Sequence, residues 1–492
     1  MHSLLYIIGM TLLWILVAAT IIHVVLDNRQ PAKTMAWALV ILFVPIVGVV
    51  FYLFFGINHR KERLISQRSV DQLSKRSMLS FVEQHDLHVP ERHKQLVDLF
   101  VNQNLSLPFK DNMIDIMTDG YAFFSELLKD IAAAQHHIHI EMYIFENDAL
   151  GRLVADALID KAQSGVEVRI IYDDVGCWQM HRRFLEHLRE KGIEIVPFLP
   201  VRFPSFTSKV NYRNHRKLIV IDGQIGYIGG MNIALRYVKG KNGQAWRDTM
   251  LRLKGGIVYS LQRTFLVDWY FVDRTLISDR KYYPAFSNLA QQEEATLAEE
   301  ISPSRGRKEG ALAQLVTSGP MAKYPEIMQG FVRAITAARH YVYIETPYFL
   351  PNEPVLFALK TASMAGVDVC LLCPHRSDAR FTAWAGRSYL RELSEAGARI
   401  YLYDAGFLHS KIMIVDDSLS TCGSTNVDVR SFEHNFESNI FIYDEGTALR
   451  LKKIFQDDLS HSVALADVPS WAHPKFMKRL WESFTRLLSP LL

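Results

Sequence analysis

One pattern of residues occurs twice in this chain, and it constrains the fold more than any other feature of the sequence. Residues 215–232 are HRKLIVIDGQIGYIGGMN, and residues 409–426 are HSKIMIVDDSLSTCGSTN, an offset of 194 residues. Each copy has His-x-Lys, then an Asp, and then Gly-x-x-Asn at identical spacing. The recurring residues are His215, Lys217, Asp222, Gly229 and Asn232 in the first copy, and His409, Lys411, Asp416, Gly423 and Asn426 in the second. A repeat of this length predicts two duplicated domains.

The segments around both copies alternate between helical and strand-like patterns. Apolar runs follow helical segments at 137–145 and 166–174 in the first copy, and at 341–349 and 367–374 in the second. This alternation predicts an α/β fold with a largely parallel or mixed sheet in each domain. We expect six parts along the chain: a transmembrane hairpin (1–59), a basic juxtamembrane linker (60–110), the first α/β domain (111–275), a polar linker (276–310), the second α/β domain (311–470) and an amphipathic basic tail (471–492).

Two apolar segments near the N-terminus are long enough to cross a membrane. Leu4–Leu26 and Met35–Ile57 contain no Asp, Glu, Lys or Arg, and each has 23 residues. At about 1.5 Å per residue, each could span a hydrocarbon core of roughly 30 Å. We expect a two-helix hairpin rather than a cleaved signal peptide, because the first segment lacks a basic start and is too long. Basic residues are more numerous after the hairpin than in its short loop, which predicts a multi-pass protein of the cell (inner) membrane with cytoplasmic catalytic domains.

The composition limits the partners and cofactors that we expect. The net charge is only +3, which gives no indication of nucleic-acid binding. The four cysteines are too few for a disulfide framework, and their spacing suits zinc poorly. Cys370 and Cys373 lie in the apolar run VDVCLLCP, so we interpret them as core residues rather than as a redox motif. We expect no cofactor, no metal and no obligate protein partner.

Each motif combines an imidazole with a fixed cation. The runs LIVI and IMIV are apolar and rich in β-branched residues, so both motifs are expected to lie on strands. Side chains alternate along a strand, so His215 and Lys217 share one face, as do His409 and Lys411. If the domains pack about a pseudo-twofold axis, all four converge on a pocket that suits a phosphodiester and needs no metal. The alternative, ordinary strand histidines, fits a single motif better than a repeated one.

The repeated motif resembles the signature of the phospholipase D superfamily, at all five positions in both copies. The apolar segment 36–56, FLVDWYF (265–271), IETPYFLP (344–351) and the terminal SPLL are similar to bacterial cardiolipin synthases. The resemblance covers nearly the whole chain, and it implies two tandem phospholipase D-type α/β domains packed as a pseudo-dimer behind the membrane hairpin. It also implies phosphatidyl transfer between two phosphatidylglycerols through a phosphatidyl-histidine, giving cardiolipin and glycerol.

The resemblance assigns roles to the two histidines and their lysines. His215 would be the nucleophile, and His409 the general acid and then the base, although the pseudo-symmetry leaves the reverse assignment open. Lys217 and Lys411 would neutralise the phosphate. Other substrate contacts are expected from the following residues and their backbone N–H groups: Asn232, Asn426, Gly229, Gly230, Gly423 and Ser424.

Four acids complete the predicted site. Glu437 matches the family's acid that orients a histidine, and Asp248 is its nearest analogue in the first half, which differs by a five-residue insertion. Asp222 and Asp416 belong to the repeated catalytic motif. They end their strands at turns, however, so we interpret them as more structural than chemical.

Two further segments favour a lipid substrate. The loop 202–217 mixes basic and aromatic residues just before the first motif, and either meets anionic headgroups or is an ordinary solvated loop. The tail 475–488 has an apolar helical stripe, which predicts a helix in the membrane interface, with packing against the domain as the alternative. Four other functions stay open: a phospholipase D hydrolase, a phosphatidylserine synthase, a nucleic-acid phosphodiesterase and a lipid-binding scaffold. The acceptor, phosphatidylglycerol or phosphatidylethanolamine, is also open.

Overall fold

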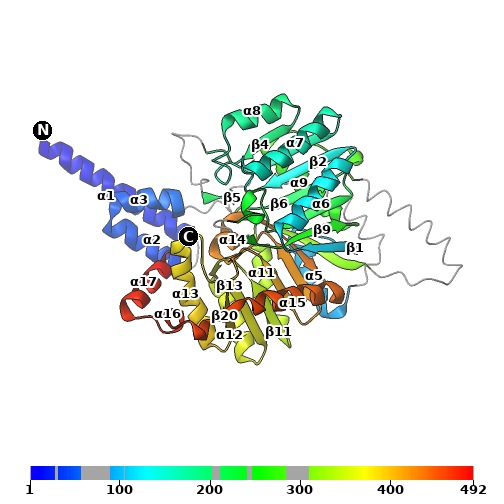
Figure 1. The fold of residues 1–492 in the computed structure, drawn as a ribbon. Helices are drawn as coiled ribbons and strands as arrows, with labels where there is room; N and C mark the ends of the chain where they lie inside the picture. Colours follow the sequence, from blue (N-terminus) through cyan, green and yellow to red (C-terminus); the bar gives the residue numbers. More distant parts are fainter. Residues whose placement is uncertain are drawn as a thin grey trace.

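A single mixed sheet runs through both halves of the chain. The structure is a computed structural model that describes residues 2–27, 31–56, 89–104, 106–201, 211–240, 246–283 and 310–490. The sheet has sixteen strands in the order β20-β14-β13-β11-β16-β17-β19-β10-β1-β9-β7-β6-β2-β3-β4, with β5 paired to β19 outside this path (Figure 1). Strands β1 (Pro108–Met117) and β10 (Ala311–Ser318) pair antiparallel at the centre. The strands of each repeat therefore extend to opposite sides of this central pair.

The first repeat places its helices between strands, as the sequence predicts. Strands β2, β3 and β4 are parallel to one another, and β2, β6, β7 and β9 continue the sheet antiparallel towards β1. The elements are α6 (Gly120–Ala133), β2 (His137–Met142), α7 (Ala149–Gln163), β3 (Glu167–Asp173), α8 (Arg182–Glu190), β4 (Glu194–Phe198), β5 (Arg213–Asn214), β6 (Lys217–Ile221), β7 (Ile225–Gly229), a 3₁₀ turn (Leu235–Tyr237), β8 (Trp246–Arg247), β9 (Met250–Lys254), α9 (Ile257–Asp273) and a second 3₁₀ turn (Arg280–Tyr282).

The second repeat follows the same order from β10 onwards, after α5 (Glu91–Asn104), which packs on its helix α11. Strands β11, β13 and β14 are parallel, and β11, β16, β17 and β19 run antiparallel towards β10. The elements are α11 (Glu326–Ala337), β11 (Tyr341–Glu345), β12 (Phe349–Leu350), α12 (Glu353–Met364), β13 (Asp368–Pro374), α13 (Arg380–Glu395), β14 (Arg399–Tyr403), β15 (Phe407–Leu408), β16 (Ile412–Val415), β17 (Leu419–Gly423), β18 (Val427–Asp428), α14 (Val429–Glu433), β19 (Asn435–Ile442), α15 (Glu445–Ser460), β20 (Ser462–Ala464), a 3₁₀ turn (Leu465–Asp467), α16 (Pro469–Ala472) and α17 (Phe476–Leu487).

The two repeats share one apolar core. Leu218 and Ile228 of the first motif lie in the same buried cluster as Ile412 and Ile440 of the second half. The opposite faces of the two half-sheets pack separately against their own helices. Because both faces of the motif strands are buried, these strands are almost entirely apolar, as in other two-sided sheets. The shared core brings the two motifs into one region of the molecule.

The N-terminal segment forms one long helix followed by shorter ones. Helix α1 (His2–Leu26) contains the apolar stretch Leu4–Leu26, which is the one described helix long and apolar enough to cross a membrane. It packs against α2 (Pro31–Phe43) and α3 (Pro45–Phe51), which leads into a π-helical turn (Tyr52–Gly56).

The second apolar segment differs from the expected continuous helix. It breaks at Val44 because Pro45 has no N–H to donate and its ring excludes the preceding helical turn. A second membrane crossing therefore remains a prediction.

Several expectations concern residues outside the described ranges. These are most of the basic linker, residues 202–210 of the loop before the first motif, and most of the polar linker 276–310. The expected domain boundaries also stay predictions. Cys370 and Cys373 are buried, free thiols on β13, as predicted for core residues.

Candidate active site

The strand that leads into the first motif pairs with the second repeat. Residues Arg213 and Asn214 of β5 lie parallel to Asn435 and Phe436 at the start of β19. The next residue, His215, donates its backbone N–H to the carbonyl of Phe436 at 2.9 Å. His215 is therefore held against the other half of the chain before its own strand β6 begins.

The second motif is held in the same way by the first repeat. Strand β15 pairs in parallel with β8, with Leu408 opposite Arg247. The backbone N–H of His409 donates to the carbonyl of Arg247 at 2.7 Å. Through this exchange of short strands the two motifs converge about a pseudo-twofold axis, as the repeated motif predicts.

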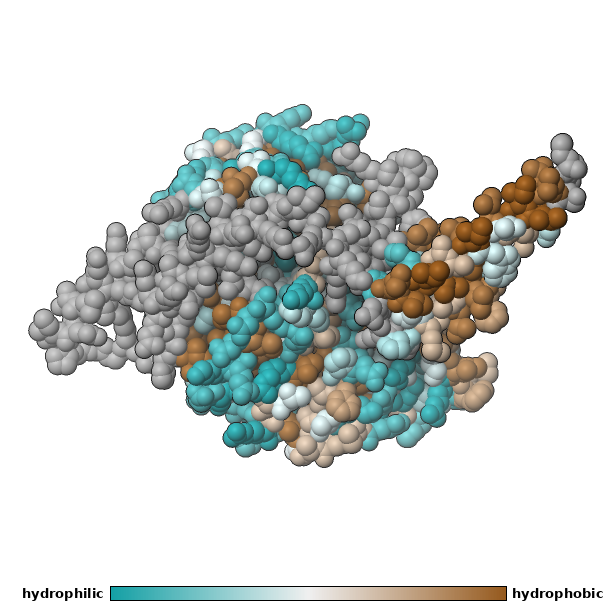
Figure 2. Space-filling view, turned by 180° about the vertical axis from the view of Figure 1, so that it is seen from behind, coloured by the Kyte–Doolittle hydropathy of each residue, from teal (hydrophilic) through white to brown (hydrophobic). Residues whose placement is uncertain are grey.

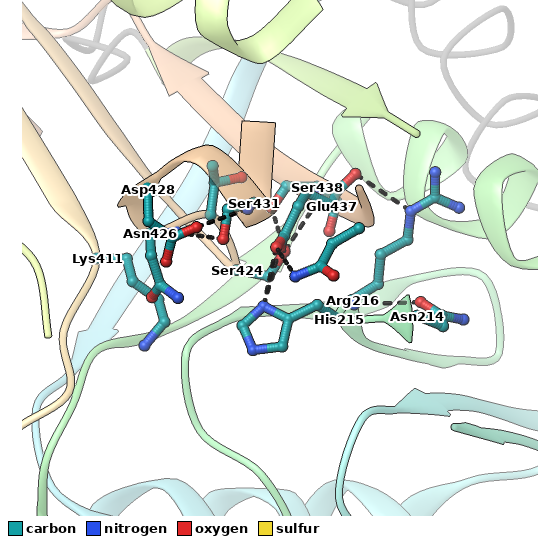
Figure 3. A network of polar contacts seen from close by, with 12 residues as sticks. Asn214, His215, Arg216, Lys411, Ser424, Asn426, Asp428, Ser431, Glu437 and Ser438 are labelled. Carbon is teal, nitrogen blue, oxygen red and sulfur yellow. Dashed lines mark hydrogen bonds and ion pairs between the residues drawn. The ribbon is translucent and has the colours of Figure 1, made fainter. Parts of the chain in front are cut away.

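Each histidine binds an acid from the other repeat. His215 Nδ1 lies 3.0 Å from one carboxylate oxygen of Glu437 and 3.1 Å from the other, as Figure 3 shows. His409 Nδ1 lies 2.6 Å from Asp248 Oδ2. A carboxylate on Nδ1 fixes the ring and the tautomer, and leaves Nε2 as the nitrogen for chemistry. The sequence singled out both acids but did not show that the pairs cross between repeats.

The two lysines lie beside their own histidines. Lys217 Nζ donates to the carbonyl of His215 at 2.6 Å, and it lies 5.0 Å from the centre of the Tyr143 ring. Lys411 Nζ lies 3.0 Å from His409 Nδ1 and also donates to the carbonyl of His409. Both lysines are buried, and each Nζ lies beside the histidine of its own motif.

Burial and these cations control protonation at the site. Burial, with a smaller effect from Lys411, lowers the pKa of Lys217 to about 7. Burial and Lys411 lower the pKa of His409 to about 3, and burial also lowers the pKa of His215. Burial alone would raise the pKa of Glu437, but its interactions with His215 and Lys217 outweigh burial and hold this pKa below its ordinary value. Without a bound anion, both rings are therefore neutral at pH 7.

The motif aspartates bind backbone rather than the histidines. Asp222 accepts from the N–H groups of residues 135, 136 and 137, just before and at the start of β2, at 2.8–2.9 Å. Asp416 accepts in the same way from residues 339, 340 and 341, just before and at the start of β11. Both sit at positive φ, 52° and 50°, in the tight turn after the motif strand. This geometry supports their interpretation as structural residues.

The motif asparagines have unlike surroundings. Asn232 accepts from the backbone N–H of Ile144 at 3.1 Å and donates to the Tyr237 hydroxyl at 2.8 Å, so both ends of its amide are engaged. The buried Oδ1 of Asn426 has no hydrogen-bond partner within the described residues. Their expected contacts with substrate stay predictions.

The glycine turns bring the acids close. A Cβ on Gly229 would lie 2.4 Å from the carbonyl of Thr249, and one on Gly423 would lie 2.2 Å from that of Ser438. At the next position the repeats differ. A Cβ on Gly230 would lie 2.1 Å from the Asp248 carboxylate, whereas Ser424 donates its hydroxyl to Glu437. We therefore assign this position to holding the acid, while the expected substrate contacts of these four residues remain untested.

A buried arginine supports each acid, and the repeated motif predicts neither of the two arginines. Arg216, between His215 and Lys217, donates to the carbonyl of Glu437 at 3.2 Å and pairs with Asp268 of α9. Burial is the main reason that the pKa of Glu141 is raised, and the nearby guanidinium of Arg216 partly opposes this increase.

Arg247 lies behind His409 as Arg216 lies behind His215. Its Nη1 donates to the carbonyl of Asp248 at 2.9 Å, and its Nη2 lies 2.6 Å from Asp458 of α15. Burial raises the pKa of the neighbouring Glu345, and the charge of Arg247 partly opposes this increase. The sequence does hint at the two arginines. The strands at 137–145 and 341–349 both have a glutamate at their fifth position, and a buried glutamate on a strand calls for a cation nearby.

Within the described part of the chain, no three His, Cys, Asp or Glu side chains are grouped as metal ligands would be. The site itself contains two imidazoles, two lysine side chains and two carboxylates. These can bind an anionic phosphodiester, attack it and move a proton.

Comparisons with known proteins agree with this geometry. The family model described as "Cardiolipin synthase, PLD-like domain" matches residues 127–269 and 331–459, and "Phospholipase_D-nuclease N-terminal" matches residues 12–56. A cardiolipin synthase of Alkalihalophilus pseudofirmus is 38% identical over 475 residues, covering 95% of this chain and 90% of that protein. The major cardiolipin synthase of Bacillus subtilis strain 168 is 36% identical over 483 residues, covering 96% of each.

A solved structure has the same fold. The phosphatidylserine synthase of Haemophilus influenzae Rd KW20 covers 82% of this chain and 100% of its own, with a TM-score of 0.58 and 14% identity. At that identity the likeness concerns the fold alone. The family is assigned by the sequence identity between this chain and the two cardiolipin synthases, which extends over nearly their full length. The chain therefore belongs to the cardiolipin synthase family, phosphatidyltransferases of the phospholipase D superfamily.

Proposed function

We propose that this chain transfers a phosphatidyl group from one phosphatidylglycerol to another through a phosphatidyl-histidine, releasing glycerol and then cardiolipin. The crosswise His215–Glu437 and His409–Asp248 pairs are the observation that carries the proposal. Two rings, each fixed at Nδ1, present two Nε2 atoms to one anion. One ring can attack phosphorus while the other gives its proton to the leaving alcohol.

The steps follow from the roles expected of the two rings. His215 Nε2 attacks phosphorus, the bond to the glycerol headgroup breaks, and glycerol leaves with the proton from His409. The headgroup hydroxyl of a second phosphatidylglycerol then gives its proton to His409 and attacks phosphorus, which frees His215. No nucleotide is needed, because a phosphodiester is present before and after the exchange.

Protonation of His409 needs the substrate. In the free site, burial and Lys411 keep the pKa of this ring at about 3. A bound phosphodiester adds a negative charge beside both lysines and draws Lys411 towards its oxygens. This raises the pKa of His409 so that it can carry the proton, while Asp248 stabilises the resulting imidazolium.

The membrane setting supplies both substrates. The apolar helix α1 supports attachment to a bilayer, where lipid alcohols are concentrated and bulk water is scarce. We extend the proposal to a multi-pass anchor in the cell (inner) membrane, with the two repeats on the cytoplasmic side.

Labelled phosphatidylglycerol in vesicles tests the reaction. We expect cardiolipin and free glycerol from the purified protein, and reversal by added glycerol. His215→Ala and His409→Ala should each lower the rate about 1,000-fold or more, while His461→Ala, an exposed histidine at the end of α15, should keep full activity. Phosphatidic acid as the main product would show a hydrolase, and full activity in either alanine variant would refute the two-histidine mechanism.

A further inference from the structure

The C-terminal helix α17 packs on the second repeat through polar side chains. Its partner is α13, and its buried residues are Glu482 and Thr485, neither of which has exposed surface. The Glu482 carboxylate lies 2.7 Å from Arg391 Nη1 and 3.7 Å from Arg387 Nη1. A buried ion pair of this kind fixes which side of the helix faces the protein.

A second ion pair holds the next turn of the same helix. Arg486 Nη2 lies 2.6 Å from Glu392 Oε2, and Nη1 donates to Ser388 at 3.2 Å. The guanidinium also lies 4.0 Å from the centre of the Tyr389 ring. Together the two pairs prevent α17 from rotating its opposite side towards α13.

That opposite side is apolar and exposed. Phe476, Leu480, Phe484 and Leu487 are 76%, 52%, 51% and 76% exposed, and their spacing places them on one stripe of the helix. A helix of a water-soluble protein has the reverse arrangement, with the apolar stripe inside. Single exposed apolar residues are common, but a complete stripe opposite a buried ion pair indicates an apolar partner.

The exposed surface continues onto α13 as a row of aromatic rings. Phe381 and Trp384 of α13 lie 5.5 Å apart, Trp384 and Trp481 lie 5.8 Å apart, and Trp481 and Phe484 lie 5.6 Å apart, measured between ring centres. Trp side chains in particular are favoured at the level of lipid headgroups. Lys475 and Arg479 are also exposed at the start of the helix, where anionic headgroups would meet them.

This surface lies on the same side of the molecule as α1 and α2, and α13 connects it to the second motif. Figure 1 shows α13 and α17 on the same side of the molecule as α1 and α2, and Figure 2 shows hydrophobic residues along α1 and again beneath it. Helix α13 packs on β12, whose Phe349 pairs with Val427, the residue after Asn426 of the second motif. A bilayer in contact with α17 would therefore meet the helix pair that α13 links to the second motif.

We propose that the apolar stripe of α17 and the aromatic row shared with α13 form a docking surface for the bilayer interface. It is a second attachment besides α1, and it presents the two-histidine site to the lipid leaflet. The ion pairs on the inner side of α17 transmit this orientation to the repeat. The docking does not depend on which lipid reaction the site performs.

Site-directed labelling of the full chain in vesicles tests the docking. The four native cysteines are buried, so a dye on Leu480→Cys reports from α17 alone, and one on Leu449→Cys reports from an exposed apolar position on α15. Vesicles of phosphatidylcholine and phosphatidylglycerol would contain lipids with a quencher at headgroup depth. We expect strong quenching at position 480 and little at 449. Equal quenching at both would overturn the proposal, as would a protected dye at 480 that lipid does not quench, which would show a second copy instead.

A paired substitution tests the consequence for turnover. Leu480→Asp with Phe484→Asp should lower activity on vesicle lipid about tenfold or more, because the second attachment sets the local concentration of substrate, and should change activity on a monomeric short-chain phosphatidylglycerol by less than about twofold. Met113→Asp with Leu449→Asp, at exposed positions on β1 and α15, is the matched control. Equal loss on both substrates, or no loss on vesicles, would contradict docking. The quenching experiment needs no turnover, so it decides docking even if the proposed reaction fails.

Discussion

Asp248 and Glu437 occupy equivalent positions in the two repeats. Glu437 lies two residues before Asn439, which pairs with Gly423 of the second motif, and Asp248 lies two residues before Met250, which pairs with Gly229 of the first. Each acid therefore lies next to the glycine turn of its own motif. It nevertheless binds the histidine of the other motif. The pseudo-twofold relation extends from the backbone to the individual carboxylates.

The first prediction concerns this exchange. Asp248→Asn should lower kcat about 100-fold or more, because an amide can neither fix the same tautomer of His409 nor stabilise its cation. Modification by diethylpyrocarbonate, followed by mass spectrometry of the peptides, would identify which ring has changed. We expect an altered rate at His409 and an unchanged rate at His215. Glu437→Gln should give the mirror result. A change at the histidine of the same repeat would show that the pairs do not cross.

A second prediction concerns the position after the motif glycine. Gly230→Ser would place a Cβ 2.1 Å from the Asp248 carboxylate in the present geometry, so this acid must move away from His409. Ser424→Gly removes only one hydrogen bond from Glu437, which keeps a second from Asn435 at 3.2 Å. We expect the loss of kcat to be at least about tenfold larger for Gly230→Ser than for Ser424→Gly. Equal losses would mean that the acids tolerate displacement.

A third prediction concerns the arginine behind His215. Arg216→Met leaves the carboxylate of Asp268 buried without its cation, which should cost about 3–5 kcal/mol of stability. Denaturant unfolding measures this loss. Arg182→Met breaks an exposed pair with Glu186 on α8 and should leave the unfolding midpoint unchanged. Equal midpoints for the two variants would show that Arg216 does not balance the buried charge of Asp268.

The fourth prediction concerns pH. Lys217 is charged below its pKa of about 7 and neutral above it, so kcat/KM for an anionic lipid should fall as the pH rises through about 7. The pKa of His215 is lowered, so this ring is still neutral at pH 6.5 and the acidic limb should lie below that value. A pH profile measured on vesicles checks both limbs.

Lys217→Arg provides the control for that profile. Arginine stays charged across the whole range, so the alkaline limb should move to higher pH even if the rate is lower. A wild-type profile that is flat from pH 6 to pH 9 would contradict the role of Lys217.

The sequence was sufficient for the features that repeat along the chain. The five motif positions and the α/β alternation depend on spacing, which the structure preserves. The two orienting acids came from the family resemblance, with Asp248 as the nearest analogue of Glu437 across a five-residue insertion. The exchange between repeats could not be predicted, because it depends on β5 meeting β19 and β15 meeting β8, which are pairings between residues far apart in the chain. Arg216 was overlooked since the motif places no constraint between its His and its Lys.

Two segments needed tertiary structure for their interpretation. The amphipathic pattern of the tail left two outcomes open, a membrane helix or a packed one, and the structure shows that α17 packs by its polar side. The hydropathy of the second apolar segment predicted a continuous helix, since composition does not register the interruption at Pro45. In both cases the sequence identified the element but not its partner or its shape.

The crosswise pairs also bear on how such a chain can evolve. A symmetric dimer of one repeat would have to accept every substitution twice, at both sites at once. Covalent fusion removes that restriction, and the position between His and Lys already differs, with Arg216 in one copy and Ser410 in the other. Each half can then diverge towards a different role in the proposed reaction. Neither half can be deleted, however, because each encodes the acid on which the opposite histidine depends.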